Sequence, residues 1–423
     1  MIVILGAGIT GLSIAYHLRE MGVDFIIIEK EKEVGGLCRS IKSGNYTFDY
    51  TGHFLHAKTN YIKALAEKLV PGIPKIKRNS FIYLKGKLIP YPFQANLNYL
   101  PLLDRIKSIK GFFIRKRKVP VNLEEWILSN FGEGMAELFF FPYNRKLWKY
   151  PLSEITPDFI ASFVPPACLF RSKRNIGYNV EFLYPRKGIG EFTTALAKEL
   201  QITHGEVIKV DDKYVLYTKG AIRYEHLVST IPLPEFLSKI DLKEDIPLSK
   251  DFLRWNSVFC LNIGIKGNLF LPDYSGRDDF SSPAKNHMGS HWIYFPEEHF
   301  PFYRIGSFTN ISPMMAPEGH SSLWVETSYR GKRPENKIID KTIEILSNLG
   351  FFDRDSVDHI LPLDIPYAYP IYNKERKEIL YYLENYLEKC NITLAGRFGG
   401  WKYSYMEESI LEGKRIAEEL CRG

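Results

Sequence analysis

Residues 1–30 alternate between hydrophobic and polar stretches in the order strand, turn, helix, strand. Residues 2–5 (IVIL) form a continuous apolar run, which is typical of a parallel strand that is buried on both faces. A second apolar run, residues 24–30 (DFIIIEK), follows the helix and carries the acidic Glu29 near its end. This pattern predicts a β-α-β unit at the start of the chain.

The hydrophobic pattern also predicts the character of the later segments. Residues 60–175 look largely helical, and residues 123–148 give the clearest helical signal. Residues 292–313 (WIYFPEEHFPFYRIGSFTNISP) alternate like a strand, although prolines are unusual within a sheet because they cannot donate to the ladder. The other predicted elements are a strand, glycine turn and helix over 181–200, a β-meander over 206–232, alternating strands over 255–330, a helix over 331–350, and a strand, glycine turn and helix over 391–421.

Composition indicates an ordinary globular protein. The chain has 423 residues, 45% of them hydrophobic and 25% charged, and its apolar runs are too short to cross a bilayer. Met1 leads directly into a strand, which leaves no room for a signal peptide. We therefore expect a cytoplasmic protein without stable membrane insertion, and the sequence leaves open whether it is a homo-oligomer.

Cysteine spacing and charge exclude several classes of site. The five cysteines are scattered without a CxxC pattern, which favours reduced thiols over disulfides and predicts no metal site. The net charge of +7 is spread over the chain and predicts no nucleic-acid-binding face. The densest basic cluster, residues 106–118 (IKSIKGFFIRKRK), is interpreted as a solvated helix end or loop in preference to a phosphate or membrane patch.

Gly6, Gly8 and Gly11 form a G-x-G-x-x-G pattern where the first strand meets the helix. The first glycine allows the turn, the second lets the backbone approach a pyrophosphate, and the third lets helix and strand pack closely. The phosphates then lie at the helix N-terminus, where free N–H groups and the dipole favour anions. Glu29 ends the second strand, where its carboxylate can accept hydrogen bonds from ribose hydroxyls. Because strand, helix, second strand and acid are all present, this stretch predicts a dinucleotide site.

The residues after Glu29 favour FAD over NAD. Gly35, Gly36 and Arg39 resemble the extended G-G-x-x-R fingerprint of the FAD-binding amine-oxidase-like superfamily. Two glycines permit close passage beside the cofactor, and Arg39 can neutralise its pyrophosphate. A surface salt bridge is the alternative role for Arg39. In these flavoproteins the meander returns to the cofactor domain with a residue at the position of Val207 near the adenosine end.

The predicted fold is α/β, with a Rossmann-like FAD-binding domain, a helical insertion and an antiparallel-sheet substrate domain. The FAD-binding domain is discontinuous, and the C-terminal helix presents its N-terminus to the flavin ring. The predicted boundaries are residues 1–60, 180–240 and 385–423 for the FAD-binding domain, 61–175 for the mainly helical insertion and 241–384 for the substrate domain.

Several histidines and aromatic residues are candidates for the site, but each also has a structural interpretation. His53 and His56 are too few for a metal site and are by default structural histidines. Tyr91, Phe93, Tyr143 and Trp148 stand beside prolines, where they could stack a planar ligand; core packing is the alternative for all four.

Five motifs together resemble UDP-galactopyranose mutases, with residues 292–313 most similar to the eukaryotic branch. They are YPFQANL (91–97), FFFPYNRKLW (139–148), residues 292–313, DIPYAYPIY (364–372) and GRFGGWKYSYM (396–406). The resemblance runs from Gly6 to the C-terminal helix. It implies a redox-neutral flavoenzyme in which N5 of reduced FAD attacks the anomeric carbon of a nucleotide sugar, with a UDP-hexose as the expected substrate. NAD(P)H is a candidate external reductant, and cell-surface polysaccharide biosynthesis is the expected context.

The resemblance also implies roles for individual residues. Arg304 falls on the family's diphosphate-binding arginine, although an ion pair with an acid such as Glu297 is the alternative. The implied substrate-binding residues are Phe93, Tyr143, Trp148, Arg304, Tyr369 and Tyr403. Gly396, Arg397 and Met406 lie on the turn beside the flavin, His53 and His56 near its ring system, and Arg304, His56 and Arg397 are the predicted catalytic residues.

Two positions depart from the family pattern. Leu183 stands where the eukaryotic branch has a second arginine, for which Arg171, Arg174, Arg186 and Lys187 are the candidate replacements. Glu407 stands where a phosphate-facing asparagine is expected, and a carboxylate beside a pyrophosphate is electrostatically unfavourable. An FAD-dependent oxidase or desaturase of the amine-oxidase or protoporphyrinogen-oxidase type is therefore the alternative function, and a non-catalytic FAD-bearing protein is a third.

Overall fold

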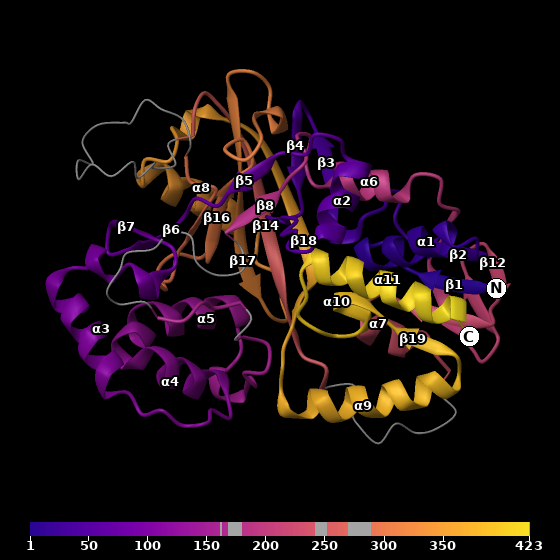
Figure 1. Cartoon of the computed structure of the whole chain (residues 1–423). Helices are drawn as coiled ribbons and strands as arrows, with labels where there is room; N and C mark the ends of the chain where they lie inside the picture. The colour runs from indigo at the N-terminus through magenta and orange to yellow at the C-terminus, as the bar shows by residue number, and fades with distance from the viewer. Residues whose placement is uncertain (161–162, 168–179, 242–251, 270–288, 423) are drawn as a thin grey trace.

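A computed structural model of the chain describes residues 1–160, 163–167, 180–241, 252–269 and 289–422. Its described part is built around two large sheets. A parallel sheet with its helices lies on the right of Figure 1, a mixed sheet lies at the centre, and a group of helices lies at the lower left. Among the described helices, none combines the length and the apolar character that a membrane span requires.

The five-stranded parallel sheet confirms the predicted β-α-β unit. Its order is β19-β13-β1-β2-β9, with every neighbouring pair parallel. The strands are β1 (Ile2–Leu5), β2 (Phe25–Glu29), β9 (Ile202–His204), β13 (His226–Ser229) and β19 (Ile392–Leu394). The sheet therefore combines both ends of the chain with a middle segment.

Both faces of this sheet are buried, as the continuous apolar run in β1 predicts. Ile2 and Ile4 contribute to the core that includes helices α1 (Ile9–Glu20) and α11 (Met406–Arg422). Val3 and Leu5 point to the other face and join a second core with the meander and further helices. These are β10 (Val207–Val210), β11 (Tyr214–Tyr217), β12 (Gly220–Arg223), α7 (Leu233–Lys239) and α9 (Lys374–Lys389). The meander is antiparallel, as predicted.

The seven-stranded sheet has the order β18-β14-β17-β16-β15-β6-β7 and forms the central layer of Figure 1. All of its neighbours are antiparallel except β15 and β6. The strands are β6 (Ser80–Leu84), β7 (Lys87–Pro90), β14 (Trp255–Lys266), β15 (Trp292–Tyr294), β16 (Arg304–Ser307), β17 (His320–Tyr329) and β18 (Val357–Pro370). One face packs on α8 (Lys337–Asn348), whose Ile343 and Leu346 join Leu323 and Val325 of β17 in one core.

Residues 292–313 form a hairpin with a long connection and not one continuous strand. β15 and β16 pair with Tyr294 opposite Arg304. Pro296 and Pro301 lie between the two strands, where no ladder hydrogen bond is lost. Residues 60–175 were predicted to be largely helical, but they also contain β6 and β7, which belong to the seven-stranded sheet. The run SFIYL in β6 is rich in aromatic and β-branched residues, which suit a strand.

The group of helices at the lower left of Figure 1 follows these strands. It comprises α3 (Leu102–Ile114), α4 (Leu123–Met135), a π-helical turn (Ala136–Phe140) and α5 (Phe141–Trp148). Gly132 has a φ of 74°, which bends the long helix predicted for residues 123–148. Pro142 lies in the first turn of α5, directly after the π-helical turn.

The remaining elements connect these layers. They are α2 (Asn60–Leu69), α6 (Gly190–Ala197), α10 (Gly396–Gly399), and two short antiparallel pairs, β3 (Ser40–Ser43) with β4 (Tyr46–Asp49) and β5 (Lys75–Lys77) with β8 (Glu181–Leu183). The four described cysteines, Cys38, Cys260, Cys390 and Cys421, are free, while Cys168 lies outside the described residues.

Candidate active site

One large cavity, of about 730 Å³, lies where the parallel sheet, α5 and the seven-stranded sheet meet. It begins at the carboxyl ends of β1 and β2, which is where open α/β sheets bind their ligands. The predicted site residues that line it are Gly6, Gly8, Glu29, Gly36, Arg39, His53, His56, Tyr143, Trp148, Val207, Arg304, Tyr369, Arg397, Tyr403 and Met406. Gly11, Phe93 and Gly396 are not among its lining residues.

The glycines form a cradle at one end of the cavity. Gly8 and Gly35 form an isolated bridge between the two glycine turns, and Gly35 N donates to Ala7 O at 2.8 Å. A Cβ on Gly8 would meet nothing within 4 Å, so this position opens onto free space. A Cβ on Gly11 would lie 2.0 Å from Gly6 O. Gly11 therefore acts in helix–strand packing, and Gly8 allows a ligand to approach the backbone.

Glu29 is held rigidly at the adjacent edge. Its Oε2 accepts from Ala7 N at 2.6 Å and its Oε1 accepts from Glu31 N at 2.9 Å. Val207 of β10 lines the same end of the cavity. A preoriented carboxylate beside a glycine turn and a helix N-terminus suits a ribose and its phosphates.

Arg39 lies between Tyr50 and the glycine cradle. Its guanidinium lies 4.6 Å from the centre of the Tyr50 ring, and Nη2 donates to the Tyr50 hydroxyl at 2.5 Å. A carboxylate oxygen of Glu31 lies 3.7 Å from Nη1, so the alternative salt bridge is also present. Arg39 Nε is buried and has no hydrogen-bond partner among the described residues. This leaves a charged donor for an anion in the cavity.

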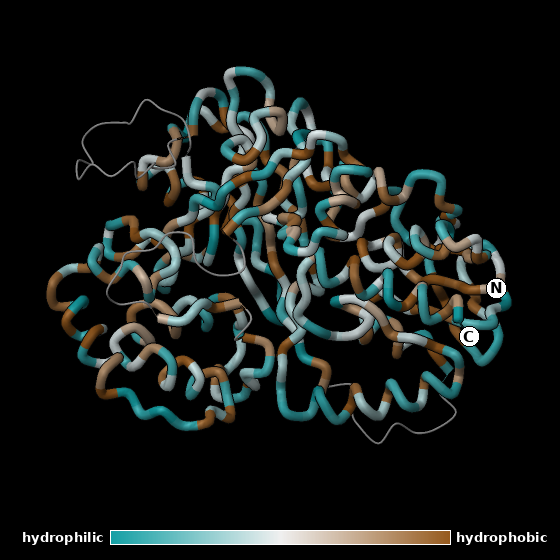
Figure 2. The backbone as a smooth tube through the Cα atoms, in the orientation of Figure 1, coloured by the Kyte–Doolittle hydropathy of each residue, from teal (hydrophilic) through white to brown (hydrophobic). Residues whose placement is uncertain are grey.

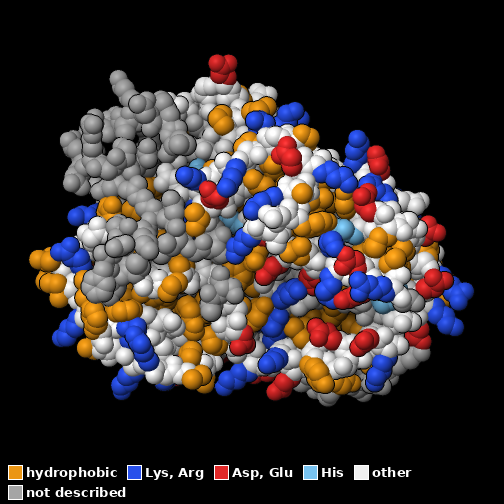
Figure 3. All heavy atoms as spheres, viewed as in Figure 1, with side chains coloured by type: hydrophobic (Ala, Val, Ile, Leu, Met, Phe, Trp, Pro, Cys, Tyr) orange, Lys and Arg blue, Asp and Glu red, His pale blue; other side chains and the backbone are white. Residues whose placement is uncertain are grey.

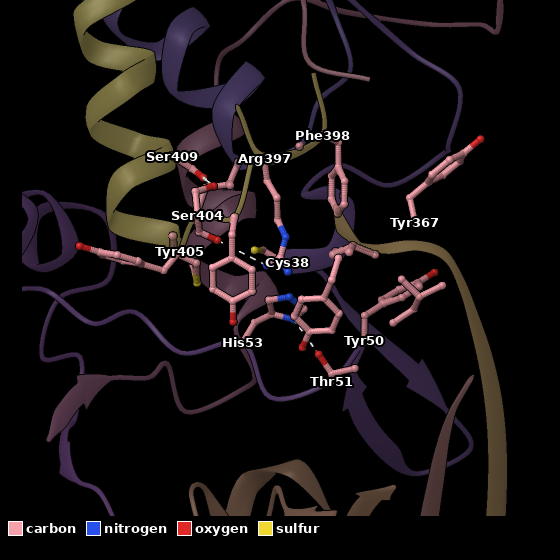
Figure 4. A pocket seen from close by; sticks show the side chains of 18 of the residues that line it. Cys38, Tyr50, Thr51, His53, Tyr367, Arg397, Phe398, Ser404, Tyr405 and Ser409 are labelled. Atoms are coloured by element: carbon pink, nitrogen blue, oxygen red, sulfur yellow. Dashed lines mark hydrogen bonds between the residues drawn. The ribbon is translucent and has the colours of Figure 1, made fainter. Parts of the chain in front are cut away.

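Arg397, on α10, also lines the cavity. Its guanidinium lies 4.7 Å from the Tyr369 ring centre and 4.9 Å from that of Tyr403. Its Nη1 donates weakly to Ser404 O at 3.4 Å, and its buried Nε has no partner in the described part of the chain. Figure 4 shows Arg397 and His53 turned toward one another, whereas the ring of Tyr405 points away from them.

Both histidines are neutral at neutral pH. Burial, together with the charge of Arg397, lowers the pKa of His53 to about 3. Burial also lowers the pKa of His56 to about 4, although its Nδ1 contacts Glu181 O at 3.3 Å. Neither imidazole therefore brings positive charge to the cavity, and because His56 Nδ1 faces a carbonyl oxygen, Nδ1 is the donor and Nε2 is an acceptor.

Arg304 is held by an acid that the sequence prediction missed. Its Nε and Nη2 donate to the two carboxylate oxygens of Glu326, each at 2.8 Å. Glu326 is fully buried and also accepts from Trp324 Nε1 at 2.7 Å and from the Tyr303 hydroxyl. The structural ion pair that the sequence offered as the alternative role of Arg304 therefore forms, with Glu326 in place of Glu297. Burial opposes the charged guanidinium, but Glu326 raises the pKa of Arg304 above its ordinary value.

Protonated tyrosines surround Arg304. Burial raises the pKa values of Tyr143, Tyr294 and Tyr403 above the ordinary value, so all three keep their hydroxyl protons at neutral pH. Tyr294 stands directly across from Arg304 in the β15–β16 pair. Tyr369 stacks on Tyr403 with ring centres 5.7 Å apart. This region of the cavity thus presents the Arg304 guanidinium and several phenolic donors, and the Arg397 guanidinium packs on two of the same rings, Tyr369 and Tyr403.

The far end of the cavity is aromatic. Trp148 lies 5.4 Å from Phe159 and 5.9 Å from Tyr369 between ring centres, while its Nε1 donates to Asn144 Oδ1 at 3.0 Å. Phe93 stacks on Phe139 and is fully buried, which is the core role that the sequence left open for it.

Several residues that line the cavity were not predicted from the sequence. Gln94, Asn144 and Tyr294 line the cavity and lie within motifs that were singled out for other residues. The signal for Glu326 is a lone acid that directly follows the apolar run LWV (residues 323–325), in a strand that is buried along nearly its whole length. Such an acid requires a buried partner.

The two residues that depart from the family pattern, Leu183 and Glu407, both lie outside the lining of the cavity. Leu183 pairs with Lys75 in the β5–β8 ladder and does not line the cavity. Of the candidate replacements, Arg186 and Lys187 are exposed and also absent from the lining, while Arg171 and Arg174 lie outside the described residues. Glu407 is buried and accepts hydrogen bonds from the backbone N–H groups of Lys58 and Thr59. It caps that turn and does not line the cavity.

Residues 9–421 match the family described as flavin containing amine oxidoreductase. The chain belongs to this family. Its cofactor is FAD, as the family description and the mutase relatives below indicate. The geometry agrees, because the glycine cradle, the oriented carboxylate of Glu29 and the free Nε atoms of Arg39 and Arg397 all fit a dinucleotide.

Three relatives of this flavin-dependent enzyme bear on its activity. A crystal structure of reduced UDP-galactopyranose mutase superimposes with a TM-score of 0.89 at 28% identity, covering 100% of this chain and 93% of that one. A dTDP-fucopyranose mutase from Escherichia coli is 26% identical over 36% of this chain and 43% of its own length. A probable flavin-containing monoamine oxidase A from Dictyostelium discoideum is 29% identical over 26% of this chain and 24% of its own length. The alignment thus spans less than half of each of these two sequence relatives.

Proposed function

We propose that the protein is a flavin-dependent mutase that interconverts the pyranose and furanose forms of a nucleotide-linked sugar, with a UDP-hexose as the expected substrate. One observation carries the proposal. The guanidinium of Arg304 is oriented by the buried carboxylate of Glu326. It lines the same cavity as the glycine cradle, together with several protonated tyrosines. Such a donor set suits a second diphosphate, separate from that of the cofactor.

Arg304 supplies the charge for binding that diphosphate. Glu326 occupies Nε and Nη2, which leaves Nη1 without a hydrogen-bond partner among the described residues. Because Glu326 fixes the plane of the guanidinium, the free edge can meet phosphate oxygens with little loss of conformational freedom. The neighbouring phenols are neutral donors, so they stabilise negative charge on a departing diphosphate without adding charge of their own.

The aromatic end of the cavity suits the base of the nucleotide. Trp148, Phe159 and Phe163 provide flat apolar faces, and Gln94 and Asn144 provide amide groups beside them. Stacking holds a planar base, while amide donors and acceptors read its edge. Base, diphosphate and sugar would then extend from this end toward Arg397 and His53.

Bound and reduced, FAD would supply the nucleophile that displaces the diphosphate from the anomeric carbon, so that no net oxidation of the sugar results. The residues of the chain orient the nucleotide and retain the diphosphate until the sugar is recaptured. His53 and His56 are neutral, so they do not attract the diphosphate away from Arg304.

An FAD-dependent oxidase is the second candidate, because the family match includes amine oxidoreductases and the Dictyostelium relative is named as one. The two functions differ in what happens to the electrons. A mutase needs reduced flavin and returns it unchanged, whereas an oxidase takes electrons from its substrate.

Both are tested in one anaerobic experiment on the FAD-loaded protein. The enzyme is reduced with dithionite, or with NADH or NADPH, and incubated with UDP-galactopyranose, other UDP-hexoses and dTDP-fucopyranose. We expect furanose isomers, identified by chromatography and NMR, only with reduced enzyme and without a change in the flavin spectrum. Bleaching of oxidised flavin by an amine or a porphyrinogen, with no isomer formed from any nucleotide sugar, would instead establish the oxidase.

A further inference from the structure

Helix α3 has its hydrophobic side turned toward solvent. The side that packs on α4 is small: Ser108 and Gly111 are buried, and a Cβ on Gly111 would lie 2.9 Å from Gly134 N. Ile109 and Phe112 pack against the core, but the other five large apolar side chains are exposed. Their exposed fractions are 60% for Leu102, 80% for Leu103, 52% for Ile106, 63% for Phe113 and 67% for Ile114. Exposed apolar residues concentrated on one helix mark an interaction surface.

The segment that follows α3 continues this surface. Val119 and Val121 are 89% and 61% exposed. Figure 1 places α3 at the outer edge of the molecule, and Figure 2 shows brown hydrophobic stretches at that edge. In Figure 3 the same edge carries orange side chains with blue ones between them. We call Leu102, Leu103, Ile106, Phe113, Ile114, Val119, Val121 and the basic residues between them the α3 surface.

The α3 surface also carries most of the chain's excess positive charge, so this charge is concentrated and not spread over the chain as the sequence interpretation had it. Residues 102–121 contain seven Lys or Arg and one Asp, a net charge of +6 against +7 for the whole chain. The acid, Asp104, is paired with Lys85 outside the segment. Lys107 and Lys118 pair with Glu137 and Glu125, but Lys110, Lys116 and Arg117 form no ion pair with any described residue.

We propose that the α3 surface binds peripherally to an anionic phospholipid surface. The combination of exposed apolar side chains and unneutralised cations is that of a helix lying in the plane of a membrane interface. Lysine and arginine are attracted by anionic headgroups, while Leu103, Ile106 and Phe113 enter the boundary between headgroups and acyl chains. The protein then remains on one side of the bilayer, and none of the described helices is long and apolar enough to cross it.

Two other binding partners, a second copy of the chain and a nucleic acid, fit the α3 surface less well. A second copy that docked through the same face would bring the free cations of two chains together, which is repulsive. A nucleic acid would use the cations but would leave the aliphatic side chains uncovered. The sequence interpretation of residues 106–118 as a solvated helix end therefore changes, because it ignored which side of the helix is buried.

The test measures binding of the FAD-loaded full chain to vesicles by sedimentation. Vesicles of phosphatidylcholine alone are compared with vesicles in which about a third of the lipid is phosphatidylglycerol, at low and high salt. We expect at least about 10-fold tighter binding to the anionic vesicles, weakened by salt. Equal binding to both vesicle types, or none to either, would overturn the proposal.

Two double variants separate the apolar and the electrostatic contributions. Leu103→Ser with Phe113→Ser, and Lys110→Glu with Lys116→Glu, are each expected to weaken binding about 10-fold or more. Tyr381→Ser on α9, 72% exposed, and Lys337→Glu on α8, 84% exposed, are the matched controls and should bind as wild type. Because all these side chains are exposed, thermal unfolding of every variant should match wild type.

Two other results would contradict the proposal. If the serine pair binds anionic vesicles as well as wild type does, the surface recognises phosphate charge alone, as a nucleic acid site would. If the wild-type chain dimerises in solution and the serine pair abolishes the dimer, the occupant is a second copy.

Discussion

At the residue scale, the buried pair of Arg304 and Glu326 organises the candidate site. The two residues stand opposite each other in the β16–β17 ladder, so the sheet itself sets their separation. Removing one partner of such a pair leaves an uncompensated buried charge. Glu326 is therefore a positioning residue, and Arg304 is the residue that we expect to contact the substrate.

Arg304→Lys tests this assignment. A lysine cannot bind Glu326 with two parallel hydrogen bonds and still present a free edge to a phosphate. We expect kcat/KM for the nucleotide sugar to fall by about 100-fold or more, with the flavin absorption spectrum unchanged. Arg415→Lys, on the exposed side of α11, is the control and should retain full activity. Near wild-type turnover by Arg304→Lys would remove the arginine from the proposed diphosphate site.

Lys146 carries a second prediction at this scale. It is buried on α5, and its Nζ donates to Phe295 O at 2.6 Å and to Glu297 O at 2.9 Å. It thus ties the helix that carries Tyr143 and Trp148 to the hairpin that carries Tyr294 and Arg304. Burial, with a smaller contribution from Lys149, lowers the pKa of Lys146 to about 7.

The lowered pKa makes stability depend on pH in a defined direction. The ordinary pKa of lysine is about 10.4, so above pH 7 the native state has lost a proton that the unfolded state keeps. The free energy of unfolding should then rise with pH by up to about 1.4 kcal/mol per pH unit, relative to Lys146→Met. Urea unfolding at pH 7, 8 and 9 measures the difference, with Lys337→Met as a surface control. Parallel pH profiles for wild type and Lys146→Met would contradict it.

At the scale of elements, two glycines of the turn between β1 and α1 have different roles: Gly8 leaves space for a ligand, and Gly11 allows close packing. Gly8 faces open space and Gly11 faces the Gly6 carbonyl, although both belong to one motif. Gly8→Ala should fold normally but weaken FAD binding by about 10-fold or more, because the new methyl group enters the space expected for the pyrophosphate. Gly11→Ala should lower the free energy of unfolding by roughly 1–3 kcal/mol or more, because its Cβ meets backbone.

The matched pair is measured by FAD titration of apoprotein and by thermal unfolding of the same samples. The two variants should differ in which quantity falls: Gly8→Ala should mainly lower the affinity for FAD, and Gly11→Ala should mainly lower the free energy of unfolding. Loss of stability in Gly8→Ala with unchanged FAD affinity would show that its neighbourhood is not the phosphate site.

At the scale of the whole molecule, the cavity is lined by residues of the parallel sheet, of α5 and of the seven-stranded sheet. FAD filling the cavity from Glu29 to Arg397 should therefore stabilise the entire chain. At about 100 times its dissociation constant, a ligand of the native state adds about 2.7 kcal/mol. We expect deflavinated protein to unfold at a lower temperature and to recover with FAD. FMN should restore little, because it lacks the adenosine part that Glu29 and the glycine cradle are placed to hold; recovery with FMN equal to that with FAD would contradict this.

The α3 surface belongs to the same scale, because it exists only through the packing of α3 on α4. Burial of Ser108 and Gly111 turns Leu103 and Phe113 outward. Hydrophobic periodicity alone would place the large residues inside. The close approach of Gly111 and Gly134 reverses that expectation, because a tight helix crossing leaves no room for large side chains.

The amino-acid sequence by itself determined the features that depend on neighbours along the chain. The β-α-β unit, the glycine turn, Glu29 and the meander follow from short-range patterns, and the motifs indicated FAD and a mutase-like relative. The division into three domains and the roles of individual site residues remain predictions. Only the tertiary structure decided that Glu326 holds Arg304, that Glu407 turns away to cap a distant turn, and that residues 292–313 form a hairpin. The reason is that each of these depends on strand register or helix crossing between segments far apart in the sequence, which no local pattern specifies.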